Sequence, residues 1–215
     1  MENSRRTLGV LSGRDVFRDQ IIRWAKQAEI ILAADAGADT LTEANVKWDL
    51  LIGDLDSVSE RALASSSSTL EIEDQDSTDC DKLLTYAEQN GISAITLIGV
   101  EGDLPDHVLA TYQSAAKSSI DVRFVFRRGV GWIVKPGLPR HLQTIAGRRL
   151  SLVPLAPCVG VNLSGCVWPL SNAELSPLGS TSISNRTESD SVSVTMEKGA
   201  ALLFLEVPAS EMPVW

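Results

Sequence analysis

The fold is decided by a short apolar run that ends in a pair of carboxylates, Leu50-Leu51-Ile52-Gly53-Asp54-Leu55-Asp56-Ser57. Its first three residues are apolar at successive positions, which is the pattern of a strand buried on both faces of a parallel sheet. The two aspartates follow at a spacing of two, so that in an extended turn both carboxylates point to one side. The glycine permits close approach of the backbone. This stretch predicts a buried strand with a hard-metal site at its carboxyl end; the alternative interpretation of the aspartates is a solvated turn with a helix N-cap.

The alternation of apolar runs and helical stretches extends outward from this segment. Apolar runs predict strands, and apolar residues spaced three or four apart predict the helices between them. The further predicted strands are Thr7–Leu11, Ile30–Ala34, Leu70–Ile72, Ala94–Ile98 and Val122–Phe126, and the predicted helices lie around Val16–Ala25 and over Asp79–Gln89 and Asp106–Lys117. The first part of the chain is therefore predicted to be an open, mainly parallel α/β sheet domain.

The pattern changes near residue 130. Helical periodicity disappears there, and Gly, Pro, Ser and Thr separate short apolar runs. These predict strands at Gly131–Val134, Leu150–Val153, Val192–Met196 and Ala200–Val207. Short strands at this spacing favour a small sandwich. We therefore predict two domains, an α/β domain over residues 1–130 and an all-β sandwich domain over residues 131–215.

Composition limits the classes of function. The chain has 215 residues, 44% of them hydrophobic, which is ample for a packed core. The net charge of −9 argues against nucleic acid or an anionic membrane as partner, since both require clustered Lys and Arg. The N-terminal sequence lacks the apolar run of a signal peptide, and no stretch approaches the roughly 20 apolar residues of a membrane span, so a cytoplasmic location is expected. The cysteines form no Cys-x-x-Cys pair and are expected to be reduced and mostly buried; they are Cys80, Cys158 and Cys166.

A second acidic cluster spans residues 74–79, Asp-Gln-Asp-Ser-Thr-Asp. Thr78 is a candidate N-cap with Asp81 three residues on, in the manner of a capping box. Asp79 then lies in the first helical turn, and Lys82 follows on the same face, where a carboxylate for metal and an ammonium for phosphate could converge. A surface ion pair is the alternative interpretation.

Further acidic residues follow other predicted strands. Asp35 comes after the strand Ile30–Ala34 and is either part of the site or a turn residue. Asp106 follows the strand Ala94–Ile98 and is either a ligand or a helix cap, and the adjacent His107 alone is a weak signal. The chain contains no Gly-x-x-x-x-Gly-Lys-[Ser/Thr], Gly-x-Gly-x-x-Gly or Gly-x-Ser-x-Gly motif. These absences disfavour a P-loop, a dinucleotide fold and an acyl-transfer elbow, and leave metal-held phosphate chemistry.

The order of these motifs resembles the thiamine pyrophosphokinase family. The resemblance rests on Ala34-Asp35-Ala36-Gly37-Ala38, on the Gly-Asp-x-Asp-Ser stretch at residues 53–57, and on the Asp-Gln-Asp-x-Thr-Asp-x-x-Lys stretch at residues 74–82. It continues at Gly99-Val100-Glu101-Gly102-Asp103-Leu104-Pro105-Asp106-His107 and, in the second half, at Ser182-Ile183-Ser184-Asn185. The resemblance thus spans nearly the whole chain.

The resemblance implies a homodimer in which thiamine lies where one subunit's catalytic domain meets its partner's sandwich. It also implies Mg²⁺-dependent transfer of pyrophosphate from ATP to the hydroxyl of thiamine, giving thiamine diphosphate and AMP. Carried over by position, the catalytic residues are Asp54, Asp56, Asp79 and Lys82, and Asp54, Asp56, Asp79, Asp35 and Asp106 hold or orient metal. The nucleotide contacts are Asp35, Lys82, Asp106, His107 and Arg14, and the thiamine contacts are Gln75, Ser184 and Asn185.

One motif departs from the family pattern. The family usually carries Gly-Gly-Arg-x-Asp where this chain has Gly102-Asp103-Leu104-Pro105-Asp106. An arginine is thereby lost and a carboxylate gained, which could cost about 1.5 to 3 kcal/mol of charge-assisted contact unless Arg14, Arg127 or Arg128 compensates. This departure motivates one alternative, a non-catalytic binder of thiamine or nucleotide. A second alternative is a pyrophosphokinase for another heterocyclic alcohol such as a hydroxymethylpterin, against which the presence of Gln75, Ser184 and Asn185 weighs.

Overall fold

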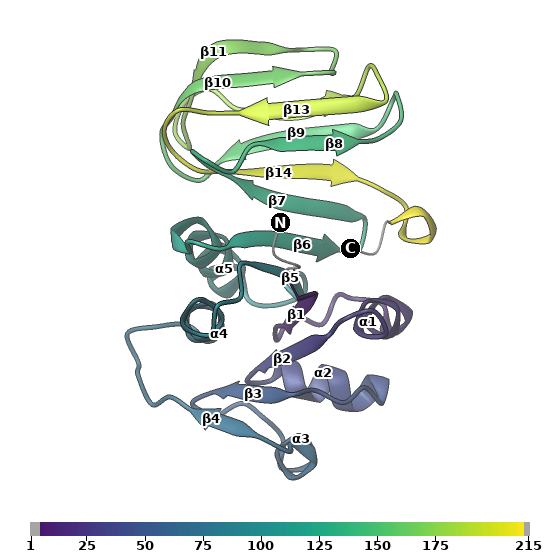
Figure 1. Cartoon of the computed structure of the whole chain (residues 1–215), viewed down its shortest axis with the longest axis vertical. Coiled ribbons are helices and arrows are strands. Elements are labelled where there is room, and N and C mark those ends of the chain that lie inside the picture. The colour runs from purple at the N-terminus through teal and green to yellow at the C-terminus, as the bar shows by residue number, and fades with distance from the viewer. Residues whose placement is uncertain (1–4, 213–215) are drawn as a thin grey trace. The chain divides into compact units, whose positions relative to one another are not determined.

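The structure is a computed structural model and describes residues 5–212. The chain divides into two compact units, the first ending at Arg127 and the second spanning Arg128–Met212. The division lies a few residues before the boundary near residue 130 that the change in sequence pattern predicts. Figure 1 shows the elements of both units.

The first unit alternates strands and helices in the order that the sequence predicts. Its strands are β1 Thr7–Val10, β2 Ile30–Ala34, β3 Leu50–Gly53, β4 Thr69–Glu71, β5 Ala94–Ile98 and β6 Asp121–Phe126. Its helices are α1 Arg18–Ala25, α2 Gly37–Ala44, α3 Glu60–Ser65, α4 Asp79–Gln89 and α5 Pro105–Lys117. The strands and the helices α1, α4 and α5 match the sequence predictions to within a few residues at their ends. The helices α2 and α3 were not predicted, because they are too short to establish a clear 3.6-residue period.

The strands of the first unit form a parallel sheet in the order β6-β5-β1-β2-β3-β4. Figure 1 shows α1 and α2 on one side of these strands and α4 and α5 on the other. The chain moves outward from β1 through β2, β3 and β4, and then crosses back to place β5 on the other side of β1. The order therefore reverses between β1 and β5, and ligands of open α/β sheets bind beyond the carboxyl ends of the strands at such a point.

The second unit is entirely β apart from a 3-10 turn, η1 at Ala209–Glu211. Its strands are β7 Gly129–Val134, β8 Arg140–Gln143, β9 Arg149–Pro154, β10 Cys158–Ser164, β11 Leu170–Leu175, β12 Ser182–Arg186, β13 Ser191–Thr195 and β14 Ala201–Glu206. They pair antiparallel in two groups, β12-β9-β14-β7 and β11-β10-β13-β8. This arrangement confirms the predicted mixed fold class, a mainly parallel α/β sheet followed by an antiparallel sandwich.

The core and the cysteines agree with the composition. Core side chains such as Leu8, Leu51, Leu97 and Phe124 are fully buried within the first unit. All three cysteines are free and buried, as predicted. Within the described residues, no helix has the length and apolar character needed to cross a membrane.

Candidate active site

Three carboxylates meet at the carboxyl ends of β2 and β3. Asp35 follows β2, and Asp54 and Asp56 follow β3; one ligand oxygen from each lies within 4.8 Å of the others. The two strands are parallel neighbours, with Ala34 in register with Ile52, so their following residues reach the same edge of the sheet. The predicted grouping of acids after buried strands is therefore present in the structure.

The backbone is shaped to bring these acids together. A Cβ atom at Gly53 would lie 2.9 Å from Cβ and 3.2 Å from Oδ1 of Asp35. Any larger residue at position 53 would therefore clash with the side chain of Asp35. Asp35 and Leu55 have φ angles of 40° and 67°, in the left-handed region that non-glycine residues rarely adopt. Such strained positions concentrate at functional sites.

Asp35 is the least solvated member of the group. Its side chain is buried at 2% exposure, and its Oδ1 atom has no hydrogen-bond partner among the described residues. Burial, reinforced by the negative charges of Asp79, Asp54 and Asp56, raises the pKa of Asp35 from 3.8 to about 6. A buried, unpartnered carboxylate oxygen facing two more carboxylates is a donor set that fits a hard divalent cation such as Mg²⁺.

An ammonium group lies beside this carboxylate group. Lys82 Nζ is 3.3 Å from Asp54 Oδ2 and 3.3 Å from Asp79 Oδ1, and its side chain is 2% exposed. Burial acts to lower the pKa of Lys82, but its hydrogen bond to Asp54 and the charge of Asp79 outweigh that effect and raise it. Burial likewise acts to raise the pKa of Asp54, and the hydrogen bond from Lys82 reverses this and lowers it. Lys82 therefore carries its charge inside the site.

The pKa of Asp79 shifts in the opposite direction to that of Asp54, although both carboxylates pair with Lys82. Burial raises the pKa of Asp79, and the nearby charge of Lys82 only partly opposes the rise. Asp79 and Lys82 sit on the first turn of α4, which begins with the predicted capping box: Thr78 Oγ1 accepts from Asp81 N at 3.1 Å, and Thr78 N donates to Asp81 Oδ2 at 3.1 Å. The cap fixes where α4 begins, and so where both side chains emerge.

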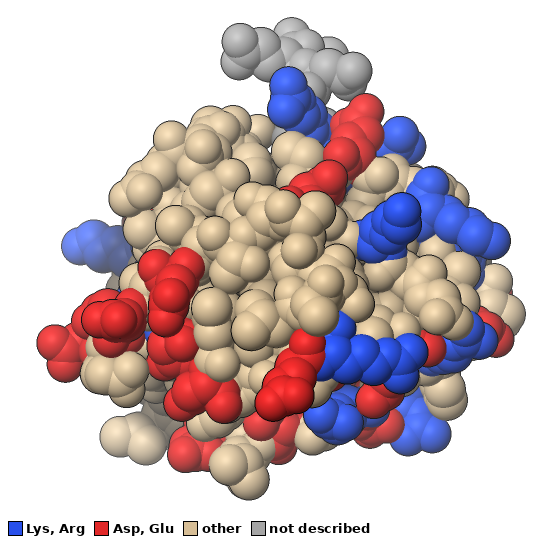
Figure 2. Space-filling model, turned by 90° about the horizontal axis from the view of Figure 1, so that it is seen from below, with Lys and Arg blue, Asp and Glu red and all other residues tan. Residues whose placement is uncertain are grey.

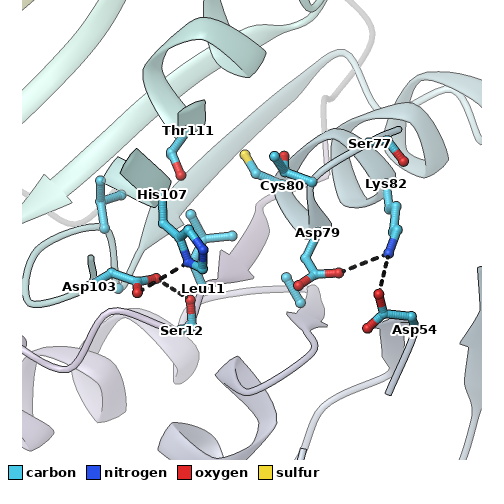
Figure 3. A pocket seen from close by; sticks show the side chains of 14 residues that line it. Leu11, Ser12, Asp54, Ser77, Asp79, Cys80, Lys82, Asp103, His107 and Thr111 are labelled. Carbon is cyan, nitrogen blue, oxygen red and sulfur yellow. Dashed lines mark hydrogen bonds and ion pairs between the residues drawn. The ribbon is translucent and has the colours of Figure 1, made fainter. Parts of the chain in front are cut away.

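A cavity of about 160 Å³ opens along these residues. Figure 3 shows Asp54, Asp79 and Lys82 on one side of it and Ser12, Asp103 and His107 on the other. On that second side, Ser12 Oγ donates to Asp103 Oδ2 at 2.5 Å, and His107 Nδ1 is 3.3 Å from Asp103 Oδ1. The cavity is thus bordered by the loops after β1, β3 and β5, at the reversal of strand order.

The surface around this edge is acidic. Glu73, Asp74 and Asp76, in the loop between β4 and α4, are exposed. Figure 2 shows Asp and Glu side chains gathered on one side of the surface, the side to which this loop projects in Figure 1, and Lys and Arg gathered on the opposite side. This edge of the sheet therefore favours cations and repels free anions.

The other residues of the first unit that were predicted for the site lie at different distances from the carboxylate group. Gln75, predicted to contact thiamine, donates from Nε2 to Asp54 Oδ2 at 3.3 Å and so lies beside the carboxylate group. Asp106 is exposed and lies outside the close carboxylate group, because α5 begins at Pro105 and its first turn faces solvent there. Arg14 does not line the cavity; its side chain is 67% exposed and lies 3.8 Å from Glu43.

The remaining predicted thiamine contacts lie in the second unit. Ser184 has a φ angle of 61°, and its Oγ atom accepts from Arg149 at 2.9 Å. Asn185 is 2% exposed, and its amide is already bonded: Oδ1 accepts from Trp168 N at 3.2 Å and Nδ2 donates to Trp168 O at 2.8 Å. In this structure Asn185 therefore holds the loop that carries the exposed Trp168.

Sequence reasoning missed Ser12 and did not assign Asp103 a site role. Ser12 is a single polar residue after β1, and no local motif marks it. Only the strand order, which places β1 beside β5, brings it to Asp103, 91 residues away in the sequence.

Two family models match the chain. Residues 22–124 match the profile described as "Thiamin pyrophosphokinase, catalytic domain", and residues 139–201 match "Thiamin pyrophosphokinase, vitamin B1 binding domain". Together the two matches cover most of the chain. The chain belongs to the thiamin pyrophosphokinase family.

Relatives and solved structures are consistent with this assignment. The chain is 24% identical over 187 residues to the thiamine pyrophosphokinase of Bacillus subtilis, an alignment covering 82% of this chain and 86% of the relative. The crystal structure of thiamine pyrophosphokinase from Bacillus subtilis superposes with a TM-score of 0.77 at 21% identity, covering 94% of this chain and 99% of that one. The yeast thiamin pyrophosphokinase structure gives a TM-score of 0.78 at 17% identity, covering 99% and 89%. At these identities the structures show that the fold is shared.

Proposed function

We propose that this protein transfers the pyrophosphoryl group of ATP to the primary hydroxyl of thiamine, giving thiamine diphosphate and AMP, and that the reaction requires Mg²⁺. The proposal rests chiefly on one observation: Asp35 presents a buried, unpartnered carboxylate oxygen to two further carboxylates, next to a buried ammonium, in a chain of this family.

Asp35, Asp54 and Asp56 are the residues that would hold the metal. When bound, Mg²⁺ neutralises phosphate charge and polarises the phosphorus that is attacked. The carboxylates supply only oxygen ligands, as that ion prefers, and their mutual repulsion in the absence of metal gives a strong electrostatic reason for binding it.

Lys82 would neutralise charge on the transferred group. Its ammonium is buried and already oriented by Asp54 and Asp79, so it needs little reorganisation when phosphate binds. Asp79 would hold Lys82 in position or join the metal ligands. We assign no general base for the thiamine hydroxyl.

The second unit would recognise thiamine, because residues 139–201 match the vitamin B1 binding profile. Ser184 and Gln75 remain proposed contacts. Asn185 holds the backbone of Trp168, and the exposed indole of Trp168 offers a face on which a planar heterocycle could stack.

Family resemblance also leads us to expect a homodimer. Sedimentation equilibrium over a range of concentrations tests this expectation directly. A mass of twice the 23.2 kDa chain is expected, and a monomer at micromolar concentration would contradict it.

A non-catalytic binder is the main competing function, because the third motif has lost its arginine. The carboxylate group weighs against it: a binder has little use for Asp35, whose buried Oδ1 atom has no hydrogen-bond partner among the described residues and so destabilises the metal-free protein. A pyrophosphokinase for another heterocyclic alcohol is disfavoured by the match to the vitamin B1 binding profile.

The test is to incubate the protein with ATP, Mg²⁺ and thiamine and to quantify AMP and thiamine diphosphate by chromatography. Equal amounts of both are expected, and neither should form with EDTA or without thiamine. Thiamine binding by calorimetry with no product in the complete reaction would support the binder instead.

A further inference from the structure

The cavity has two chemically different sides. On one side, Lys82 offers hydrogen-bond donors and positive charge, which suit phosphate. On the other side lie Ser12, Asp103 and His107, which come from the loops after β1 and β5 and the first turn of α5. Figure 3 shows this second group on the far side of the cavity from the ammonium.

The carboxylate of Asp103 determines what its neighbours can do. Its side chain is 19% exposed, and it accepts from Ser12 Oγ at 2.5 Å and from the backbone N of Leu104 at 2.7 Å. His107 Nδ1 lies 3.3 Å from Asp103 Oδ1. A carboxylate can only accept, so Nδ1 of His107 carries the hydrogen that points at Asp103.

The outward-facing atoms are therefore acceptors. The hydroxyl hydrogen of Ser12 is committed to Asp103, which leaves the lone pairs of Ser12 Oγ. An imidazole that keeps its single hydrogen on Nδ1 presents Nε2 as an acceptor. This side of the cavity is suited to groups that donate hydrogen bonds and, because Asp103 is negative, it is unsuited to phosphate.

Resting on the proposed function, we infer that Ser12 and His107 form the ribose subsite for the nucleotide donor, with Asp103 as the positioning residue that sets their polarity. The ribose is joined directly to the phosphates that Lys82 would contact, and its 2′- and 3′-hydroxyls are the nearest hydrogen-bond donors of the nucleotide. Asp103, the carboxylate that this chain has gained relative to the family pattern, thus orients the side chains of Ser12 and His107 towards the ribose.

The test is calorimetric binding, without thiamine, of the Mg²⁺ complexes of ATP, 2′-deoxy-ATP, 3′-deoxy-ATP and inosine triphosphate. Removing a recognised hydroxyl is expected to weaken binding to the wild-type protein roughly three- to tenfold, the worth of one neutral hydrogen bond. In Ser12→Ala and His107→Ala the ratio of ATP to deoxy-ATP affinity should fall towards one, because the partner atom is already gone.

Two further variants sharpen the result. Asp103→Ala should also reduce the ratio, and in steady-state kinetics it should raise the KM for ATP while leaving kcat little changed. The control is Leu109→Ala, on the same helix but exposed and outside the cavity lining, which should keep the wild-type ratio.

Equal affinity of the wild-type protein for ATP and both deoxy-nucleotides would overturn the inference. A loss with inosine triphosphate alone would also overturn it, since that would assign the acceptors to the adenine amine. The nucleotide-binding measurement needs no turnover. Absence of thiamine diphosphate in the separate product assay would therefore contradict the proposed reaction, while the binding ratios would still test the ribose subsite.

Discussion

Asp35 combines three unfavourable features: a buried carboxylate, a positive φ angle and an oxygen atom that finds no partner within residues 5–212. Each of these costs free energy in the metal-free protein, and a bound cation would relieve the first and the third. The residue is therefore better explained by a ligand than by the stability of the fold.

The substitution Asp35→Asn is expected to stabilise the metal-free protein. The folded-state pKa of Asp35 is raised from 3.8 to about 6, so the folded protein holds this proton more tightly than the unfolded chain, and wild-type stability falls as the pH rises between those values. Asparagine has no charge to bury and tolerates the positive φ angle. Urea unfolding in EDTA should show a gain on the order of 3 kcal/mol at pH 7.

The pH dependence of that gain provides the control. It should be small near pH 4 and level off above about pH 7, since the carboxyl group of the wild-type protein is neutral in the first case and fully charged in the second. A variant that is less stable than the wild-type protein at every pH would count against this account of Asp35.

Leu104 stands where the family usually has an arginine. Two arginines of the first unit, Arg14 and Arg127, were candidates to replace its charge, and neither lines the cavity. Arg14 lies near Glu43, and Arg127 Nη1 is 2.6 Å from Asp15 Oδ1. Leu104→Arg should therefore lower the KM for ATP roughly tenfold, the worth of one charge-assisted hydrogen bond. Leu104 is the exposed N-cap residue of α5. The same change at Leu109, equally exposed on α5 but outside the third motif, is the matched control and should have no effect.

The helix α4 positions Asp79 and Lys82 by its N-terminal cap. Thr78→Ala removes the side chain that accepts from Asp81 N, and should cost about 1 kcal/mol of unfolding free energy by urea denaturation. It should also reduce kcat, because Asp79 and Lys82 lie in the turns that the cap fixes. Thr78→Ser keeps the hydroxyl and should retain both properties; equal losses in the two variants would exclude the capping role.

Local patterns account for what the sequence could predict of these elements. The cap of α4 and the pairing of Asp79 with Lys82 depend on residues three positions apart, and both are present as predicted. The contact of Ser12 with Asp103 depends on the order of strands in the sheet, and no local spacing encodes it. The bonded amide of Asn185 was likewise beyond prediction, because its partners come from the neighbouring loop at Trp168.

At the level of the whole molecule, metal binding should be visible in stability. A ligand that binds only the folded state stabilises it by about 2.7 kcal/mol at a hundredfold excess over its Kd. Mg²⁺ should therefore raise the Tm of the wild-type protein in a thermal melt, and the rise should be absent from Asp54→Asn. Asp19→Asn, an equivalent change at an exposed residue of α1, should keep the full rise, and an undiminished rise in Asp54→Asn would place the metal elsewhere.

The central claim is that an intact pyrophosphoryl group moves from ATP to thiamine. Time-resolved ³¹P NMR of the complete reaction tests it most directly, since it distinguishes every phosphate product. The account predicts that the ATP signals are replaced by those of AMP and thiamine diphosphate in equal amounts, without ADP or inorganic phosphate. Formation of ADP, with either thiamine monophosphate or inorganic phosphate, would contradict it.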